Sequence, residues 1–316
     1  MTWNSSGITT TASYALPDDV LYTQLAAGNG FSFGLKENGA IDGVGADLYN
    51  QVSNRPSSGT WIAVAAGYDH GLALKNDGTL AAWGDNTYGQ GEVPIDEYAQ
   101  ASENALTYTA IAAGEYFNLA LRSDGTIFAW GHNQYGKLDV PNNTVGEYVE
   151  IAAGGHHAAA RKGTGTMKAW GGSGYSANNC SGSYSEYTHP GSVPSSLSST
   201  TFIAIGAGHT FTFGIRADRT VVVWGCGCGV QGTASSTNGY YVVGATNANK
   251  VTGLYAGGLS LSLDAYITQW GDISGSGCST VLNNPPNTLP SSITSDKFES
   301  VGKGNSNFHG VAILKP

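Results

Sequence analysis

The chain has 316 residues, a net charge of −9 and a pI near 5.1. Its 14 Lys and Arg residues form no cluster, so a nucleic-acid partner, whose affinity would depend on phosphate contacts, is not expected. No apolar run is long enough to cross a bilayer, and membrane insertion is not expected either. The 46 Gly residues recur at regular places between apolar runs, which argues against a collagen-like or disordered chain.

A short phrase recurs along the chain. In its clearest form Ala65-Ala66-Gly67 is followed, sixteen positions after the Gly, by Trp83-Gly84. Self-similarity at a period of some tens of residues indicates one supersecondary unit stacked several times. Further copies with the same offset run from Ala112-Ala113-Gly114 to Trp130-Gly131, from Ala152-Ala153-Gly154 to Trp170-Gly171, and from Gly206-Ala207-Gly208 to Trp224-Gly225.

Weaker copies extend the pattern to both ends of the chain. Ala26-Ala27-Gly28 keeps the offset to Val44-Gly45, whereas Tyr255-Ala256-Gly257 reaches Trp270 in thirteen positions, which predicts a shortened hairpin. A seventh copy begins at Val301-Gly302-Lys303-Gly304, and the sequence stops before its Trp-Gly. The segment Met1-Thr2-Trp3-Asn4 is strand-like, so we expect it to supply the missing strand and close a ring.

The apolar pattern within each repeat predicts three strands. Residues 108–113 are short and apolar, 117–121 alternate with period two, and 126–130 form the third strand. The Asp124-Gly125 pair between the last two favours a tight hairpin turn. The Gly of Ala-Ala-Gly is interpreted as a strand end where a side chain would collide or where φ is positive. The whole chain, 1–316, is expected to form one domain, with repeat cores near 22–45, 61–84, 108–131, 148–171, 202–225, 250–271, and 298–316 plus 1–7.

Such small sheets cannot bury both faces alone, and radial stacking into a β-propeller leaves only short, protected edges. The phrase Ala-Ala-Gly, a His or aromatic residue, Leu-Ala-Leu, Asp-Gly and Trp-Gly resembles the RCC1-type repeat. The repeat spacing is similar to the short-repeat bacterial members of that family, which include a β-lactamase inhibitor protein. The seven copies predict an all-β, seven-bladed propeller whose ring is closed by the N-terminal strand, and the resemblance agrees with this fold. It says little about function, because propellers are scaffolds.

The segments after each Trp-Gly vary in length and should emerge on one face, where recognition by a rigid scaffold is commonly placed. They are rich in Tyr, which gives a large contact area at low entropic cost. A recurring Tyr five positions after the Trp would form an arc on this rim, either as a recognition surface or as packing between blades. The candidate partner-binding residues are Tyr49, Tyr88, Tyr135, Tyr175, Tyr184, Tyr187, Tyr240 and Tyr241.

Trp and His residues at repeat positions are interpreted as packing residues. The Trp of each Trp-Gly is assigned to the core: Trp83, Trp130, Trp170, Trp224 and Trp270. His70, His157 and His309 fall near a position that Phe occupies in sister repeats. The pair His156-His157 offers metal ligands, but adjacent strand residues point to opposite faces. No metal site is therefore predicted.

The four cysteines all follow a Trp-Gly: Cys180, Cys226, Cys228 and Cys278. A disulfide between neighbouring loops, free thiols and metal binding are all compatible with their positions. The Cys-Gly-Cys spacing is shorter than that of ordinary zinc sites. A disulfide would agree with a location outside a reducing cytosol.

Motifs for phosphate binding, zinc proteolysis or serine hydrolysis are absent from the sequence. We therefore expect no enzyme activity, no catalytic residues and no cofactor. The composition is rich in Ser, Thr, Asn, Gly and Tyr, and the sequence given has no signal peptide. These features predict a virion or extracellular location and a non-enzymatic scaffold, on a phage capsid or tail, that binds a protein or surface glycan and other virion proteins. The alternatives are a secreted bacterial binding or inhibitor protein and, third, a glycan-active enzyme.

Overall fold

The computed structural model describes residues 16–17, 20–97, 106–172 and 189–225 with their side chains. Outside these ranges it describes the backbone of eight strands: β1 (Thr2–Asn4), β2 (Gly7–Ile8), β18 (Tyr241–Val243), β19 (Ala248–Gly253), β20 (Gly257–Ser262), β21 (Ile267–Gly271), β22 (Phe298–Gly302) and β23 (Gly310–Leu314). Among the described residues, no helix has the length and apolar character needed to cross a membrane.

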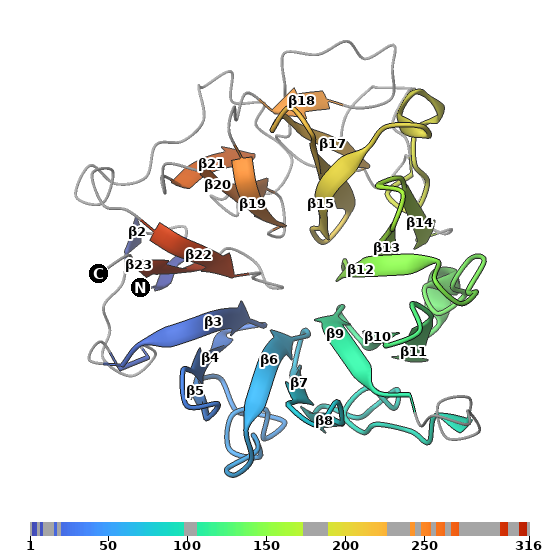
Figure 1. Ribbon diagram of the computed structural model, residues 1–316. Helices are drawn as coiled ribbons and strands as arrows, with labels where there is room; N and C mark the ends of the chain where they lie inside the picture. Colours follow the sequence, from blue (N-terminus) through green and yellow to red (C-terminus); the bar gives the residue numbers. More distant parts are fainter. Residues whose placement is uncertain are drawn as a thin grey trace.

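Four consecutive repeats each form a three-stranded antiparallel sheet, and the fifth adds β18 as a fourth strand, which confirms the predicted all-β fold of repeated short sheets. Figure 1 shows the sheets arranged around a common centre, with the first strand of each repeat innermost. The first strands are β3 (Tyr22–Ala27), β6 (Trp61–Ala66), β9 (Tyr108–Ala113), β12 (Tyr148–Ala153) and β15 (Phe202–Ala207). The second strands are β4 (Phe31–Lys36), β7 (His70–Lys75), β10 (Phe117–Arg122), β13 (His157–Lys162) and β16 (Phe211–Arg216). The third strands are β5 (Ile41–Gly45), β8 (Leu80–Gly84), β11 (Ile127–Gly131), β14 (Met167–Gly171) and β17 (Val221–Gly225).

Packing explains the Gly of the Ala-Ala-Gly phrase. A Cβ on Gly114 would lie 1.9 Å from a ring carbon of Phe117, three residues on, and a Cβ on Gly67 would lie 1.9 Å from a ring carbon of His70. The Gly114 N–H also donates to the Phe117 carbonyl at 2.8 Å. The interpretation that a side chain would collide here is confirmed, because the ring at the third following position folds back over the Gly.

The hairpin turns use the expected local chemistry. Gly39, Gly78 and Gly125 have φ values of +81°, +80° and +81°. Left-handed backbone of this kind carries no steric penalty for Gly. In the fifth repeat the same turn contains Arg219 with φ +68°. A non-Gly residue is thus accommodated there by the surrounding pairing of β16 with β17.

The Trp residues join neighbouring sheets. Trp83, Trp130, Trp170 and Trp224 are 6%, 4%, 6% and 1% exposed, so the prediction that they belong to the core is confirmed for these four. Trp83 packs against Phe33 of the preceding sheet with ring centroids 5.2 Å apart. The indole N–H of Trp83 donates to the Gln51 carbonyl at 2.7 Å. The hydrophobic core therefore lies between sheets rather than within one of them.

The sixth repeat corrects one expectation. In β20 and β21, Gly257 pairs with Gly271 and Gly258 pairs with Trp270, which is the register that Phe117 and Asn118 have with Gly131 and Trp130. Leu254 therefore holds the position of the repeated Gly, sixteen residues before Trp270. The predicted shortening of this hairpin is wrong, because Gly257 begins the second strand instead of ending the first.

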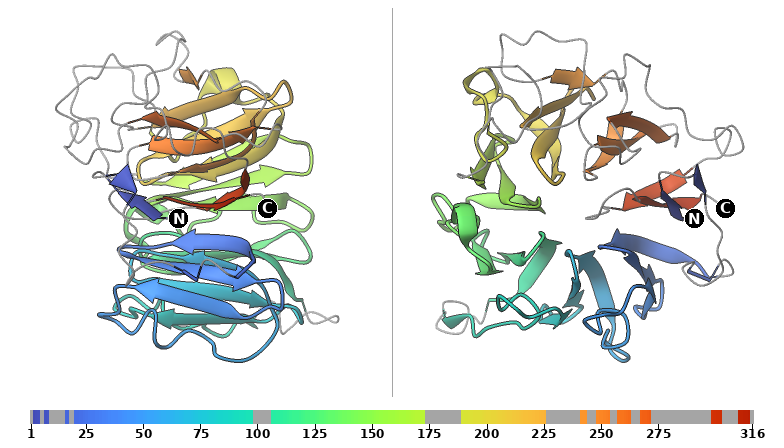
Figure 2. Two further views of the ribbon diagram at one scale, coloured as in Figure 1. Left: turned by 90° about the vertical axis from the view of Figure 1, so that its left-hand side faces the viewer. Right: turned by 180° about the vertical axis from the view of Figure 1, so that it is seen from behind.

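Strands from the two ends of the chain share one sheet, in the order β2, β1, β23, β22. Thr2 pairs with Val311 and Trp3 with Gly310, antiparallel. Figures 1 and 2 show β1 and β23 side by side from three directions. The N-terminal strand thus occupies the third-strand position beside β23.

Candidate functional site

The loop face is formed by two sets of segments that meet at one rim. The first set is the three-residue loops that connect the first and second strands: 28–30, 67–69, 114–116, 154–156 and 208–210. The second set is the segments that follow the third strands. The two sets are joined by backbone hydrogen bonds, from Asp85 N–H to the Asp69 carbonyl at 2.9 Å and from His132 N–H to the Tyr116 carbonyl at 2.8 Å.

Backbone hydrogen bonds also tie loops of successive repeats to one another. The Asn29 N–H donates to Tyr68 at 2.8 Å, and the Tyr68 N–H donates to Glu115 at 3.1 Å. Farther round, the Gly155 N–H donates to His209 at 3.0 Å. Side chains on these loops are therefore presented by a frame that fixes the backbone on both sides.

The predicted Tyr residues within the described ranges lie on this face. Tyr49 and Tyr88 are 43% and 47% exposed, and Tyr135 is half-buried. Tyr241 lies in β18, where the backbone alone is described. The remaining candidates lie outside the described residues: Tyr175, Tyr184, Tyr187, Tyr240, Cys180, Cys226, Cys228 and Cys278.

Four rings form what we call the tyrosine cluster: Tyr68, Tyr88, Tyr116 and His132. The Tyr88 ring stacks on His132 with centroids 4.1 Å apart and meets Tyr116 edge-on at 5.5 Å. Tyr68 lies 5.7 Å from Tyr116. Burial raises the pKa of Tyr116, and the charge of Glu115 adds to this, so its hydroxyl stays neutral. The cluster joins the second and third repeats into one surface of neutral rings.

The turn after each Tyr is held by a buried side chain. The Gln90 Oε1 accepts a hydrogen bond from the Tyr88 N–H at 2.9 Å, and Gln90 is fully buried. In the third repeat Lys137 replaces this Gln and is also fully buried. Its Nζ lies 3.5 Å from His132 Nδ1 and 5.4 Å from the centroid of the Phe117 ring. Burial lowers the pKa of Lys137 to about 8, against the opposing effect of Glu115.

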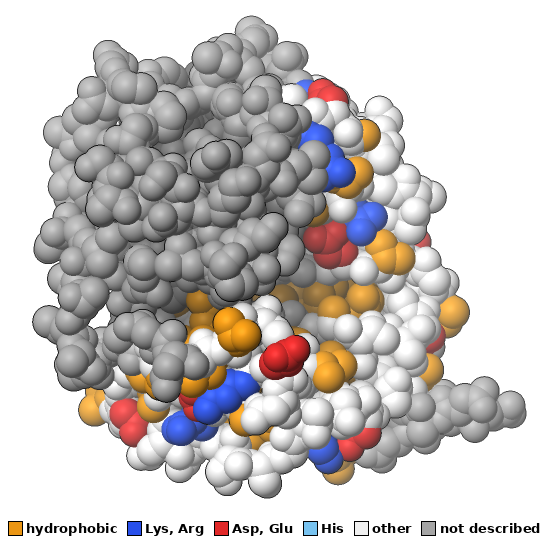
Figure 3. Space-filling view, turned by 60° about the vertical axis from the view of Figure 1, so that its left-hand side comes forward, with side chains coloured by type: hydrophobic (Ala, Val, Ile, Leu, Met, Phe, Trp, Pro, Cys, Tyr) orange, Lys and Arg blue, Asp and Glu red, His pale blue; other side chains and the backbone are white. Residues whose placement is uncertain are grey.

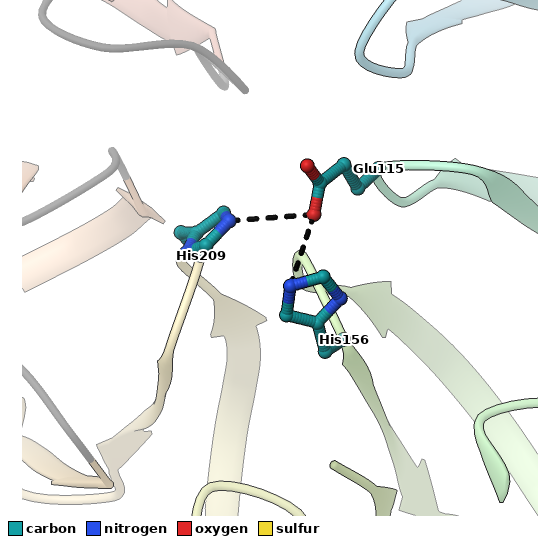
Figure 4. Close-up of side chains that lie close together, drawn as sticks. All are labelled: Glu115, His156 and His209. Atoms are coloured by element: carbon teal, nitrogen blue, oxygen red, sulfur yellow. Dashed lines mark ion pairs between the residues drawn. The ribbon is translucent and has the colours of Figure 1, made fainter. Parts of the chain in front are cut away.

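A second group on the loop face consists of Glu115, His156 and His209, from three successive repeats (Figure 4). Glu115 Oε2 lies 3.2 Å from His156 Nε2 and 3.4 Å from His209 Nε2. One ligand atom from each residue lies within 4.8 Å of the others. We call this group the His-Glu cluster, and its three side chains are of types that bind metal ions.

The environment of the His-Glu cluster pulls its pKa values in opposite directions. Burial lowers the pKa of His156 to about 4, although the Glu115 charge acts the other way. Burial would raise the pKa of Glu115, but the hydrogen bond from His209 and the electrostatic interactions with His209, His156 and Lys137 lower it below its ordinary value. At neutral pH the cluster therefore contains a carboxylate beside a neutral His156.

The sequence did not predict the His-Glu cluster or the Tyr68 and Tyr116 rings. Glu115 and His209 follow their repeated Gly by one residue, whereas His156 follows Gly154 by two, since Gly155 comes between them. A comparison of equivalent positions in the repeats therefore does not bring Glu115, His156 and His209 together. In neighbouring repeats, the loops between the first and second strands meet at one rim. Applying that rule to the sequence would have predicted that these three side chains lie close together. His157, beside His156, is fully buried, as is His70, so the packing interpretation of these two is confirmed; His309 lies outside the described residues.

Asp85 is an acidic residue of the loop face whose carboxylate stabilises a turn. It is 7% exposed, and its carboxylate accepts hydrogen bonds from Thr87 Oγ1 at 2.6 Å and from Gln90 Nε2 at 2.7 Å. These bonds fix the turn that carries Tyr88. On the described part of the surface in Figure 3, acidic and basic side chains are interspersed with hydrophobic ones, and neither sign forms a large patch. That mixture favours contact with a surface of mixed character over a strongly charged polymer.

Comparison with known proteins agrees with the fold and the repeat. The Regulator of chromosome condensation (RCC1) repeat matches residues 61–90 and 108–137. A search of curated protein sequences found no match. Prp20p from Saccharomyces cerevisiae, a protein described with its binding to Gsp1p and histones, is similar in structure with a TM-score of 0.71 at 14% identity, over 100% of this chain and 91% of that one.

Two other solved structures extend the similarity. Human WBSCR16 aligns with a TM-score of 0.68 at 18% identity, over 96% of this chain and 89% of that one. The ectodomain of the Arabidopsis thaliana receptor kinase ACR4 aligns with a TM-score of 0.64 at 17% identity, over 93% and 90% of the two chains. At such identities the likeness shows a shared propeller fold.

Proposed function

We propose that the chain is an RCC1-like repeat propeller that acts as a non-enzymatic interaction scaffold and binds a protein partner through the loop face; the repeat match at residues 61–90 and 108–137 and the propeller fold support this. The scaffold is a seven-bladed ring closed by β1. The observation that carries the proposal is the tyrosine cluster, in which half-exposed rings of two repeats are in mutual contact beside the exposed Tyr88.

The physical case rests on pre-organisation. Tyr and other large rings dominate protein interfaces, because they bury much area while immobilising few torsions. In the tyrosine cluster, ring contacts and the Gln90 turn already restrict those torsions. The loops are held by hydrogen bonds between repeats, so little entropy remains to be lost on binding. The fold likeness to Prp20p, which is described with protein partners, supports a protein over a nucleic acid.

Tyr88→Ala tests the proposal, with Ile62→Ala as the matched control. Ile62 is 54% exposed and lies at the far end of β6 from the loop face. Immobilised wild-type and variant proteins are used to capture proteins from the source organism, and bound proteins are quantified by mass spectrometry. A specific partner should bind the wild type and Ile62→Ala equally well. It should bind Tyr88→Ala about tenfold less tightly, because loss of a hot-spot ring costs about 1.4 kcal/mol or more of binding free energy. Equal capture by all three, or binding to a glycan array and to no protein, would contradict it.

The location of the scaffold is a separate proposal. A composition rich in small polar residues and Tyr supports a place on a phage capsid or tail or outside the cell. Mass spectrometry of purified particles and of culture supernatant tests it. Recovery from the cytosol alone would contradict both locations.

A further inference from the structure

We propose that Glu115, His156 and His209 bind a divalent transition-metal ion, with Zn²⁺ as the expected species. The inference does not depend on the identity of a protein partner. Two imidazoles and one carboxylate are a ligand set that suits Zn²⁺, and three protein ligands leave a coordination position for water or another group.

The distances fit a single ion. Ligand bonds of about 2.0–2.1 Å in tetrahedral geometry place ligand atoms about 3.3 Å apart. Glu115 Oε2 lies 3.2 Å from His156 Nε2 and 3.4 Å from His209 Nε2. The Nε2 atoms of both rings are thus directed at the same carboxylate oxygen, as Figure 4 shows. A small shift of that oxygen opens the space for an ion between the three atoms.

The backbone supports the site from more than one repeat. The Gly155 N–H to His209 carbonyl hydrogen bond holds the loop of His156 against that of His209. The ring of Tyr135 meets His156 edge-on at 5.5 Å, and the two His rings meet edge-on at 5.2 Å. Fixed ligand orientation of this kind favours affinity for the metal.

The site is both enclosed and accessible. The side chains of His156, Glu115 and His209 are 18%, 13% and 9% exposed. An ion could therefore enter from the loop face without any strand moving. Lys137 acts electrostatically on both Glu115 and His156, and its positive charge should weaken metal binding.

Calorimetric titration with Zn²⁺ tests the proposal on full-length, tag-free protein that has been treated with a chelator. The four cysteines are first alkylated, because thiolates are themselves zinc ligands. The expected result is one ion per chain. Glu115→Gln and His209→Ala should each weaken binding by at least about tenfold, since even outer-shell changes weaken metal sites by about 10–100-fold.

Two further variants sharpen the test. His70→Phe removes an imidazole that is buried in the second repeat, outside the His-Glu cluster, and should leave the affinity unchanged. Lys137→Gln restores the residue found at this turn position in the first two repeats, Gln51 and Gln90, and should tighten binding. Co²⁺ in place of Zn²⁺ should give the visible absorption of a four-coordinate site in the wild type and lose it in Glu115→Gln, a near-isosteric change that spares the fold.

Failure to bind Zn²⁺ at millimolar concentration would overturn the proposal. Unchanged binding in both Glu115→Gln and His209→Ala would do the same. In either case the His-Glu cluster would be a hydrogen-bonded contact between repeats and no metal site.

Discussion

His156 and His157 are neighbours in sequence but belong to different regions of the molecule. His157 is fully buried at the start of β13, where its ring occupies the space beside Gly154 that a side chain would need. His156 lies on the loop face, 3.2 Å from Glu115. Packing dictates the residue three positions after the repeated Gly, whereas the two before it can vary in each repeat. We call the strands and the buried side chains between them the frame. The offset of a residue from the repeated Gly, rather than its type, therefore decides whether it belongs to the frame or to the loop face.

Substitution of a repeated Gly should show the largest effect on the frame. Gly114→Ala would place a Cβ 1.9 Å from a ring carbon of Phe117, and we expect a loss of about 3 kcal/mol in unfolding free energy because overpacking displaces a buried ring. Gly163→Ala is the control, since its added Cβ would meet Val149 at 3.8 Å, an ordinary contact, and should change stability by less than about 0.5 kcal/mol. Urea denaturation measures both. Similar losses in the two variants would show that the Gly114 position is not set by this collision.

The buried histidine of the frame should make stability depend on pH. His70 is fully buried, its Nε2–H donates a 2.9 Å hydrogen bond to Asn118 Oδ1, and burial lowers its pKa from 6.5 to about 4. The unfolded chain therefore binds more protons than the folded one between these values. This stabilisation is present above pH 6.5 and is lost as the pH falls towards 4. The shift corresponds to about 3 kcal/mol at the acid end of this window.

His70→Phe tests this pH dependence, because Phe occupies the same position in three sister repeats as Phe31, Phe117 and Phe211. The variant should lose about 1 kcal/mol at pH 7 with the Asn118 hydrogen bond. It should also show a shallower fall in unfolding free energy between pH 6.5 and 4. Part of the fall should remain, because burial lowers the pKa of His156 to about 4 as well. An unaltered slope would mean that His70 titrates normally in the folded protein.

On the loop face the effect on stability should be smallest. Tyr88 is 47% exposed, and Tyr88→Ala removes ring contacts with His132 and Tyr116 without opening the core. We expect a loss of less than about 1 kcal/mol by urea denaturation. A loss as large as that of Gly114→Ala would place Tyr88 in the frame and remove the distinction on which the proposed function depends.

Much of the frame could be predicted, because each of its features leaves a local signal. Alternating apolar residues, the Asp124-Gly125 turn and the spaced Trp residues indicate strands, hairpins and a core without any long-range information. The error in the sixth repeat has a physical cause. Ala256-Gly257 imitates the phrase, while Leu254 holds the equivalent position, and only the register with Trp270 distinguishes them.

The candidate site could be predicted only in part. The sequence places Tyr49, Tyr88 and Tyr135 on one face because they share one offset from the third strand, and their role in binding a partner stays a prediction. The His-Glu cluster was missed because its members come from three repeats at two different offsets from the Gly, so their approach depends on how the sheets are arranged about the centre. Arrangement of that kind is a property of the assembled fold and not of any one repeat.

The paired variants His156→Ala and His157→Ala, each measured for unfolding free energy in chelator and for Zn²⁺ affinity, test the separation of frame from face most directly. The account predicts that His157→Ala loses about 2–4 kcal/mol, as expected for truncation of a buried ring, yet keeps its zinc affinity. It predicts that His156→Ala stays within about 1 kcal/mol of the wild type and loses zinc binding. Equal loss of stability in the two variants, or retained zinc binding in His156→Ala, would contradict it.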